Sequence, residues 1–216
     1  MPSIAFDCDG TLVDSEPLHN RADVTVLAQF GIVLDPQEHL RRSTGIGRTA
    51  MLRIIEQEHG VTLPADTQQR IEAELHRLVA AELEPIPSVV RVLTALSERG
   101  AHMAVASNSH AAYIEQALQS CGIRHFFGDR IASSDHVERL KPAPDIYLLA
   151  ARMLGTSPAQ CIAVEDSQAG VVAAHAAGMR TIAFCPAGHV FTPAQLERAG
   201  AQTVIGDFDA LLDLIT

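Results

Sequence analysis

Carboxylates are crowded near the N-terminus of the chain. The stretch FDCDGTLVDSE at 6–16 places Asp7, Asp9, Asp14 and Glu16 directly after an apolar start. Like charges at this spacing repel one another, and burial raises the cost of each charge. The crowding therefore predicts a bound cation, with Asp7 and Asp9 as the first candidates for its site.

Three later segments carry further side chains that could do chemistry. Ser107 and Asn108 follow the apolar run 102–106, and Glu165 and Asp166 close the run that begins at 161. Between them stands Lys141, the single lysine among 16 basic residues. Because lysine and arginine are not interchangeable in a tight site, we expect Lys141 to supply a compact positive charge.

The elements that must position these residues alternate along the chain. Apolar runs predict strands at 3–8, 102–106, 161–165, 180–184 and 203–205. Helical periodicity predicts helices at 88–99, 110–121, 143–154, 168–177 and 207–215. Such alternation is typical of a parallel sheet covered by helices, and ligands of these sheets bind outside the carboxyl ends of the strands.

Residues 17–84 interrupt the alternation. They show helical periodicity only, for instance Ile71, Leu75 and Leu78 on one face of a helix. We therefore expect two domains, an α/β core formed by 1–16 and 85–216 and a helical insertion formed by 17–84.

Four short motifs occur in a fixed order: DCDGTLVD, SNS, KPAPD and EDSQAG. In this order they resemble the haloacid dehalogenase-like hydrolase superfamily over essentially the whole chain. The resemblance implies a Rossmann-like parallel sheet core with an inserted small helical cap domain. It also implies phosphoryl transfer through an aspartate nucleophile, with Mg²⁺ as cofactor. The nearest branch is that of sugar-phosphate phosphatases, which includes 6-phosphogluconate phosphatase.

The physical roles of the core residues fit this resemblance. A carboxylate attacks an anionic phosphate ester only when a metal offsets both charges, which makes Asp7 the expected nucleophile. The Asp7 and Asp166 carboxylates and the Asp9 carbonyl are expected to bind Mg²⁺, with Glu165 either a ligand or next to the ligands. Asp9 is the expected general acid and base.

The remaining candidates would bind substrate. Ser107 and the Asn108 amide are expected to donate to phosphoryl oxygens, and Lys141 to offset their charge. In the cap, Arg48 follows Gly45 and Gly47 at an expected helix start, where an arginine could meet a substrate anion. His19 could face the cleft between cap and core. A solvated Arg48 and an ordinary helical His19 are the open alternatives.

Composition limits the partners. The chain has 216 residues, is 47% hydrophobic and carries a formal charge of −10, which argues against nucleic acid or an anionic membrane as partner. No stretch approaches the roughly 20 apolar residues of a membrane span, so a cytoplasmic location is expected. The expected partner is a small phosphorylated metabolite. The sequence does not predict an oligomeric state.

Two other functions remain open at this point. The segments GIGRTAML and KPAPDIY are similar to the β-phosphoglucomutase branch, although the expected cap lacks the lysine that this branch uses for a second phosphate. A non-catalytic metabolite-binding regulator is the alternative from another class, but such a protein has no need of all four motifs. Phosphonate cleavage is excluded because it depends on a lysine in the cap.

Overall fold

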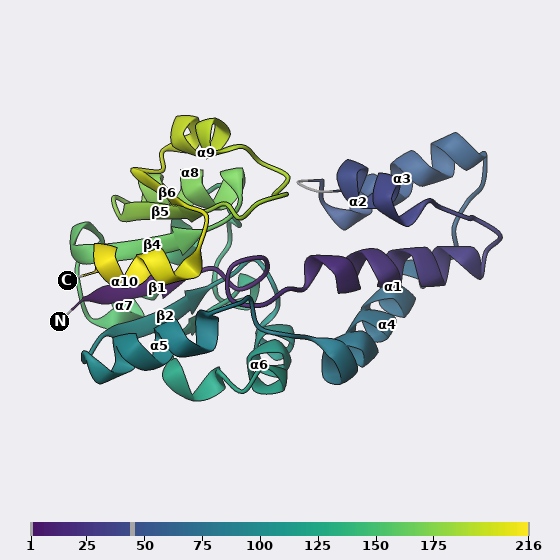
Figure 1. Cartoon of the computed structure of the whole chain (residues 1–216). Helices are drawn as coiled ribbons and strands as arrows, with labels where there is room; N and C mark the ends of the chain where they lie inside the picture. Colours follow the sequence, from purple (N-terminus) through teal and green to yellow (C-terminus); the bar gives the residue numbers. More distant parts are fainter. Residues whose placement is uncertain (1, 44–45, 216) are drawn as a thin grey trace. The chain divides into compact units, whose positions relative to one another are not determined.

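The computed structural model describes residues 2–43 and 46–215, so Gly45 lies outside the described residues. The chain separates into two compact units, which Figure 1 shows along the colour gradient. The first, called the sheet unit, comprises Met1–Asp14 and Glu84–Thr216, and the second, called the helical unit, comprises Ser15–Leu83. Each is described by itself.

The sheet unit contains six strands in the order β3-β2-β1-β4-β5-β6, and all neighbouring strands are parallel. The strands are β1 (Ser3–Phe6), β2 (His102–Ala106), β3 (Ile131–Ala132), β4 (Cys161–Glu165), β5 (Arg180–Phe184) and β6 (Thr203–Ile205). The helices are α5 (Val89–Glu98), α6 (Ala111–Ser120), α7 (Asp145–Leu154), α8 (Gln168–Ala176), α9 (Pro193–Ala199) and α10 (Leu211–Leu214). Short 3₁₀ turns occur at Arg124–Phe126, Ser134–His136, Pro158–Gln160 and Phe208–Ala210. The predicted α/β class with a parallel sheet is confirmed.

Several predicted elements need correction. The first strand ends at Phe6 and does not reach residue 8, and the helix expected at 207–215 is a 3₁₀ turn followed by the short α10. Strand β3 was not predicted because two residues are too short to show alternation. Helix α9 was also not predicted, although Pro193 and a capping box between Thr192 and Gln195 mark its start.

The two faces of the sheet differ in side-chain size. Ala5, Ala104 and Ala163 lie in one core cluster with residues of α7 and α8. Phe6 lies on the other face, where its ring centroid is 6.3 Å from those of Phe127 and Phe208. Helices α5 and α10 pack together away from α7 and α8, so both faces are covered (Figure 1).

This alternation positions the first functional side chains. Ala5 of β1 pairs with Ala163 of β4. Asp7 follows Ala5 by two residues, and Glu165 follows Ala163 by two residues. Since successive side chains of a strand point to opposite faces, both carboxylates are directed to the alanine-rich face that α7 covers.

The helical unit consists of α1 (Glu16–Ala28), α2 (Pro36–Ser43), α3 (Arg48–His59) and α4 (Thr67–Glu82). Its α4 buries the predicted apolar face of Ile71, Leu75 and Leu78. A second small core joins Leu27 and Ile32 to Met51 and Ile55 of α3. Among the helices of residues 2–43 and 46–215, none has the length and apolar character to cross a membrane.

Candidate active site

Lys141 connects two carboxylates at the carboxyl ends of β1 and β4. Its ammonium nitrogen Nζ donates to Asp7 Oδ1 and to Glu165 Oε1, both at 2.6 Å. The Asp7 backbone amide donates to the Val164 carbonyl at 2.9 Å, which continues the pairing of the two strands up to this point. Only 4% of the Lys141 side chain is exposed, so the charge acts inside the protein rather than in solvent.

Asp7, Glu165 and Asp166 form a buried acidic cluster. Each contributes a carboxylate oxygen, and these oxygens lie within 4.8 Å of one another. Three carboxylates against the one ammonium of Lys141 leave a formal charge of −2. Hard oxygen donors with this excess charge fit a divalent cation such as Mg²⁺.

Burial and the crowding of like charges raise the pKa of two carboxylates in the cluster. Burial raises the pKa of Asp7 well above its usual range, with Glu165 and Asp166 adding to the rise and Lys141 opposing it. Burial also raises the pKa of Asp166, against the effect of His189. Burial alone would lower the pKa of Lys141, but its pairing with Asp7 and Glu165 raises it. Lys141 therefore stays charged.

Two glycines make room for these carboxylates. A β-carbon on Gly10 would overlap the Asp166 carboxylate, and one on Gly170 would overlap the Glu165 carboxylate. Gly10 also has φ +78°, a left-handed conformation that other residues adopt at a cost. Both positions therefore require glycine for the cluster to form.

Glu165 is held by five donors. Its Oε1 accepts from Lys141 and from the Tyr147 hydroxyl at 3.1 Å. Its Oε2 accepts from the Asp166 amide, the Ser167 amide and the Ser167 hydroxyl at 2.9–3.0 Å. The Tyr147 ring also lies 5.0 Å from Nζ of Lys141, within the range of a cation–π contact. Glu165 and Tyr147 thus fix the direction of the ammonium.

Asn108 fixes the backbone of Lys141. Its Oδ1 accepts from the Lys141 amide at 2.9 Å and its Nδ2 donates to the Lys141 carbonyl at 3.4 Å. Ser107 is 2% exposed, and its hydroxyl accepts from the Ser109 amide at 3.0 Å. The SNS motif at 107–109 and the KPAPD motif at 141–145 are therefore joined by direct contacts.

The Asp9 carboxylate has partners outside the acidic cluster. It accepts from the hydroxyls of Ser109 and Tyr113, each at 2.8 Å. Asp9 lies beyond the end of β1 at Phe6, so these two contacts, and not strand alternation, set the direction of its side chain. Asp9 lies in the turn after β1, where the Gly10 amide donates to the Val13 carbonyl at 2.9 Å.

Several residues at this site were not singled out from the sequence. Tyr113 and Tyr147 donate to Asp9 and Glu165, and Thr11 donates to Asp166 at 3.2 Å. His189 Nε2 lies 3.5 Å from Asp166 Oδ2. One signal was available, because the chain contains only two tyrosines and both donate to carboxylates at this site.

Arg48 and His19 come together within the helical unit. Arg48 Nη2 lies 3.0 Å from His19 Nδ1, and Arg48 Nε donates to Asp23 Oδ1 at 3.2 Å. The other oxygen of Asp23 lies 3.3 Å from Nε2 of the buried His39. Asp23 and His39 were not predicted, because their contacts depend on how α1, α2 and α3 pack.

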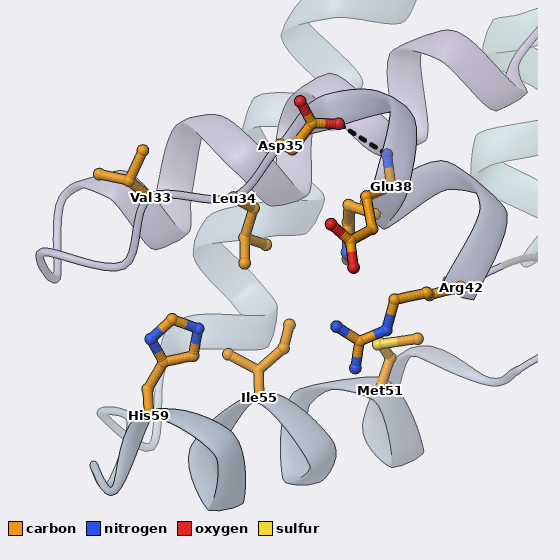
Figure 2. A pocket seen from close by; sticks show the side chains of 9 residues that line it. Val33, Leu34, Asp35, Glu38, Arg42, Met51, Ile55 and His59 are labelled. Carbon is orange, nitrogen blue, oxygen red and sulfur yellow. Dashed lines mark hydrogen bonds between the residues drawn. The ribbon is translucent and has the colours of Figure 1, made fainter.

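A pocket of about 190 Å³ also lies within the helical unit. Figure 2 shows Glu38 and Arg42 of α2 on one side and Met51, Ile55 and His59 of α3 on the other. Arg42 is paired with Glu58 at 2.5 Å, and Asp35 accepts from the Glu38 amide at 2.8 Å. The described residues that line this pocket include none of those predicted for the site.

Comparisons with known proteins agree with the motifs and the fold. A family model described as haloacid dehalogenase-like hydrolase matches residues 1–178. The chain is 37% identical over 188 residues to 6-phosphogluconate phosphatase of Escherichia coli strain K12, covering 87% of this chain and 84% of that protein. It is 36% identical over 180 residues to a fructose-1-phosphate phosphatase of the same strain, covering 83% of this chain and 94% of the other.

A solved structure gives the same result. The haloacid dehalogenase family hydrolase from Deinococcus radiodurans R1, crystallised with bound phosphate and sodium, superposes with a TM-score of 0.83 at 31% identity. The match covers 98% of this chain and 93% of the other. On the matched family model, the level of identity and the shared fold, the chain belongs to the haloacid dehalogenase-like hydrolase family.

Proposed function

We propose that this enzyme, a phosphoric monoester hydrolase, is an Mg²⁺-dependent phosphatase of small phosphorylated metabolites, with sugar phosphates as its substrate class. The observation that carries the proposal is the buried cluster of Asp7, Glu165 and Asp166 around Lys141. The names of the two bacterial relatives support sugar phosphates and sugar-acid phosphates as the first compounds to test.

The acidic cluster would hold the metal. The Asp7 and Asp166 carboxylates and the Asp9 backbone carbonyl are the proposed ligands, and Glu165 offers a further oxygen. When bound, Mg²⁺ offsets negative charge on the nucleophile and on the phosphoryl group, which allows two anions to approach each other. Gly10 and Gly170 support this assignment, because the carboxylates of Asp166 and Glu165 occupy the space that a β-carbon at these two positions would fill.

In the proposed first step, an Asp7 oxygen attacks phosphorus and the bond from phosphorus to the leaving oxygen breaks. Asp9 gives its proton to that oxygen, and an aspartyl-phosphate remains on Asp7. Lys141 offsets charge on the phosphoryl oxygens, while the Ser107 hydroxyl and the Asn108 backbone amide donate to them. The Asn108 side chain has a separate role, since it holds the Lys141 backbone.

In the second step, water attacks the phosphorus of the aspartyl-phosphate and gives a proton to Asp9. The bond between phosphorus and the Asp7 oxygen breaks, which frees inorganic phosphate and restores both carboxyl groups to their starting states. Asp9 therefore acts as acid in the first step and as base in the second.

Arg48 and His19 are the proposed substrate contacts of the helical unit. Arg48 Nε donates to Asp23, and Arg48 Nη2 lies 3.0 Å from His19 Nδ1. These contacts hold the guanidinium in place, and 22% of the Arg48 side chain is exposed. A fixed, partly exposed guanidinium suits a distal carboxylate or phosphate of the substrate.

The test is phosphate release from a panel of phosphorylated metabolites, with Mg²⁺ or with EDTA. We expect turnover of 6-phosphogluconate, fructose 1-phosphate or related compounds with Mg²⁺ only. Release of no phosphate from any compound, 4-nitrophenyl phosphate included, would favour the non-catalytic regulator. Conversion of β-glucose 1-phosphate that depends on glucose 1,6-bisphosphate would favour the mutase, which the absence of lysine from the helical unit argues against.

A further inference from the structure

The direction of the Asp9 side chain is set by two hydroxyl groups on different elements. Tyr113 Oη donates to Oδ1 and Ser109 Oγ donates to Oδ2, each at 2.8 Å. One hydrogen bond would leave the carboxylate free to swing about the bonded oxygen. Two bonds on two oxygens fix both the position and the plane of the carboxylate.

Tyr113 is placed rigidly. It is 6% exposed and lies in the first turn of α6. The start of α6 is fixed in turn, because the Ala111 amide donates to Asp135 Oδ2 at 2.8 Å and His110 Nδ1 lies 2.6 Å from Asp135 Oδ1. Ser109 lies just before this helix, and its amide donates to Ser107. Both hydroxyls therefore project from a supported segment.

We propose that Tyr113, together with Ser109, is a positioning residue for Asp9, and that it keeps this carboxylate aligned for the proton transfers of the reaction. The inference rests on the proposed role of Asp9 as general acid and base. A hydroxyl group can donate or accept a hydrogen bond, so both contacts can persist whether or not Asp9 carries a proton. The two contacts are compatible with both steps.

A purely structural role for the Tyr113 hydroxyl would give a different result. A buried tyrosine hydroxyl needs some partner, and Asp9 could be no more than that partner. In that case removal of the hydroxyl would change stability and leave the balance between the two chemical steps unaltered. The steps must therefore be measured separately.

The substrate 4-nitrophenyl phosphate separates formation of the aspartyl-phosphate from its hydrolysis. Its leaving group, 4-nitrophenolate, is a weak base and departs without a proton, so formation of the aspartyl-phosphate does not need acid from Asp9. Hydrolysis of the aspartyl-phosphate still needs Asp9 to accept a proton from water. General acid–base catalysis by a well-placed side chain raises the rate of a step by about 10²- to 10⁴-fold. Partial misalignment of Asp9 is therefore expected to slow hydrolysis of the aspartyl-phosphate by about tenfold or more.

The experiment follows the first turnover of Tyr113→Phe by stopped-flow absorbance with Mg²⁺ present. We expect rapid release of about one 4-nitrophenolate per enzyme, followed by a steady state about tenfold or more slower than that of the wild type. Acid quenching should trap more phosphate bound to the protein than in the wild type. With 6-phosphogluconate, whose leaving alkoxide needs a proton, the first turnover should slow as well.

Two further variants make the test specific. Ser109→Ala removes the hydroxyl from the other oxygen and should give the same burst, which also covers the case that Tyr113→Phe does not fold. Tyr147→Phe removes the same atom from the other tyrosine, which donates to Glu165, and should give no burst. Steady-state rates within twofold of wild type for Tyr113→Phe and Ser109→Ala would overturn the inference, as would equal slowing of both phases or a burst in Tyr147→Phe. An inactive wild type would instead overturn the proposed phosphatase function.

Discussion

Lys141 donates to Asp7 at 2.6 Å while both side chains are almost completely shielded from solvent, at 4% and 11% exposure. The ammonium of the single lysine is thus directed at the proposed nucleophile. An ion pair in this setting is strong only while its geometry is kept, because both partners have lost their hydration. The pair therefore depends on the two side chains that hold Lys141, namely Asn108 at its backbone and Glu165 at its ammonium.

The first prediction concerns the nucleophile. Asp7→Asn should leave less than about 1% of wild-type turnover, because the amide has nearly the same shape but cannot attack phosphorus. Thermal unfolding should show a folded protein, since Lys141 keeps Glu165 as a partner. Phosphate release is the measurement, with purified Asp7→Asn also checked for protein-bound phosphate. Turnover above this level, or phosphate bound to the Asp7→Asn protein, would show that Asp7 is not the nucleophile.

A second prediction concerns metal and pH. Burial raises the pKa of Asp7 and of Asp166, so the metal-free native protein keeps protons on these groups that the unfolded chain releases near pH 4. Stability of the metal-free protein should fall as pH rises from about 4 through the raised pKa values. Mg²⁺ binds the deprotonated carboxylates, so the rise in Tm that it causes should grow with pH.

Thermal unfolding in EDTA and in MgCl₂, between about pH 5 and pH 8, measures this directly. Asp166→Asn is the matched variant, since it removes one carboxylate and keeps the shape of the side chain. It should weaken both the pH dependence and the effect of Mg²⁺. A Tm increase with Mg²⁺ that is the same at every pH, or unchanged in Asp166→Asn, would contradict the proposed ligand set.

The third prediction concerns the space that Gly170 provides. In Gly170→Ala the new methyl group must displace the Glu165 carboxylate, which also holds Lys141. We expect a loss of about 1–3 kcal/mol of stability from overpacking, together with a large loss of kcat. Gly206→Ala is the control, because its β-carbon would lie 3.6 Å from the Cys185 carbonyl, an ordinary contact. Chemical denaturation and phosphate release compare the two variants, and wild-type kcat in Gly170→Ala would show that Glu165 has no part in placing Lys141.

The sequence predicted the parallel sheet because β-branched and alanine-rich runs alternate with amphipathic helices at regular distances. It also drew attention to Lys141 through composition alone. It missed Tyr113 and Tyr147, because a hydroxyl on the inner face of a helix looks like a core residue until the packing of α6 and α7 against the strands is known. The Asp23 carboxylate was missed for the same reason, since its two contacts come from two other helices of the helical unit.

The last prediction concerns Arg48. Arg48→Ala should raise KM for 6-phosphogluconate by about tenfold or more, because a charge-assisted hydrogen bond to the distal carboxylate contributes about 1.5–3 kcal/mol. It should barely change KM for 4-nitrophenyl phosphate, which has no distal anion. Asp23→Asn should give a smaller effect in the same direction, because it loosens the guanidinium and keeps its charge.

Arg53→Ala is the matched control for Arg48, since Arg53 is an exposed arginine on the same helix. It should leave both KM values close to those of the wild type. Equal losses on both substrates in Arg48→Ala would indicate damage to the helical unit, and a change in Tm would report that damage independently. Unchanged KM values for both substrates would instead make Arg48 a structural partner of Asp23 and His19, because the contacts within the helical unit would then be its whole role.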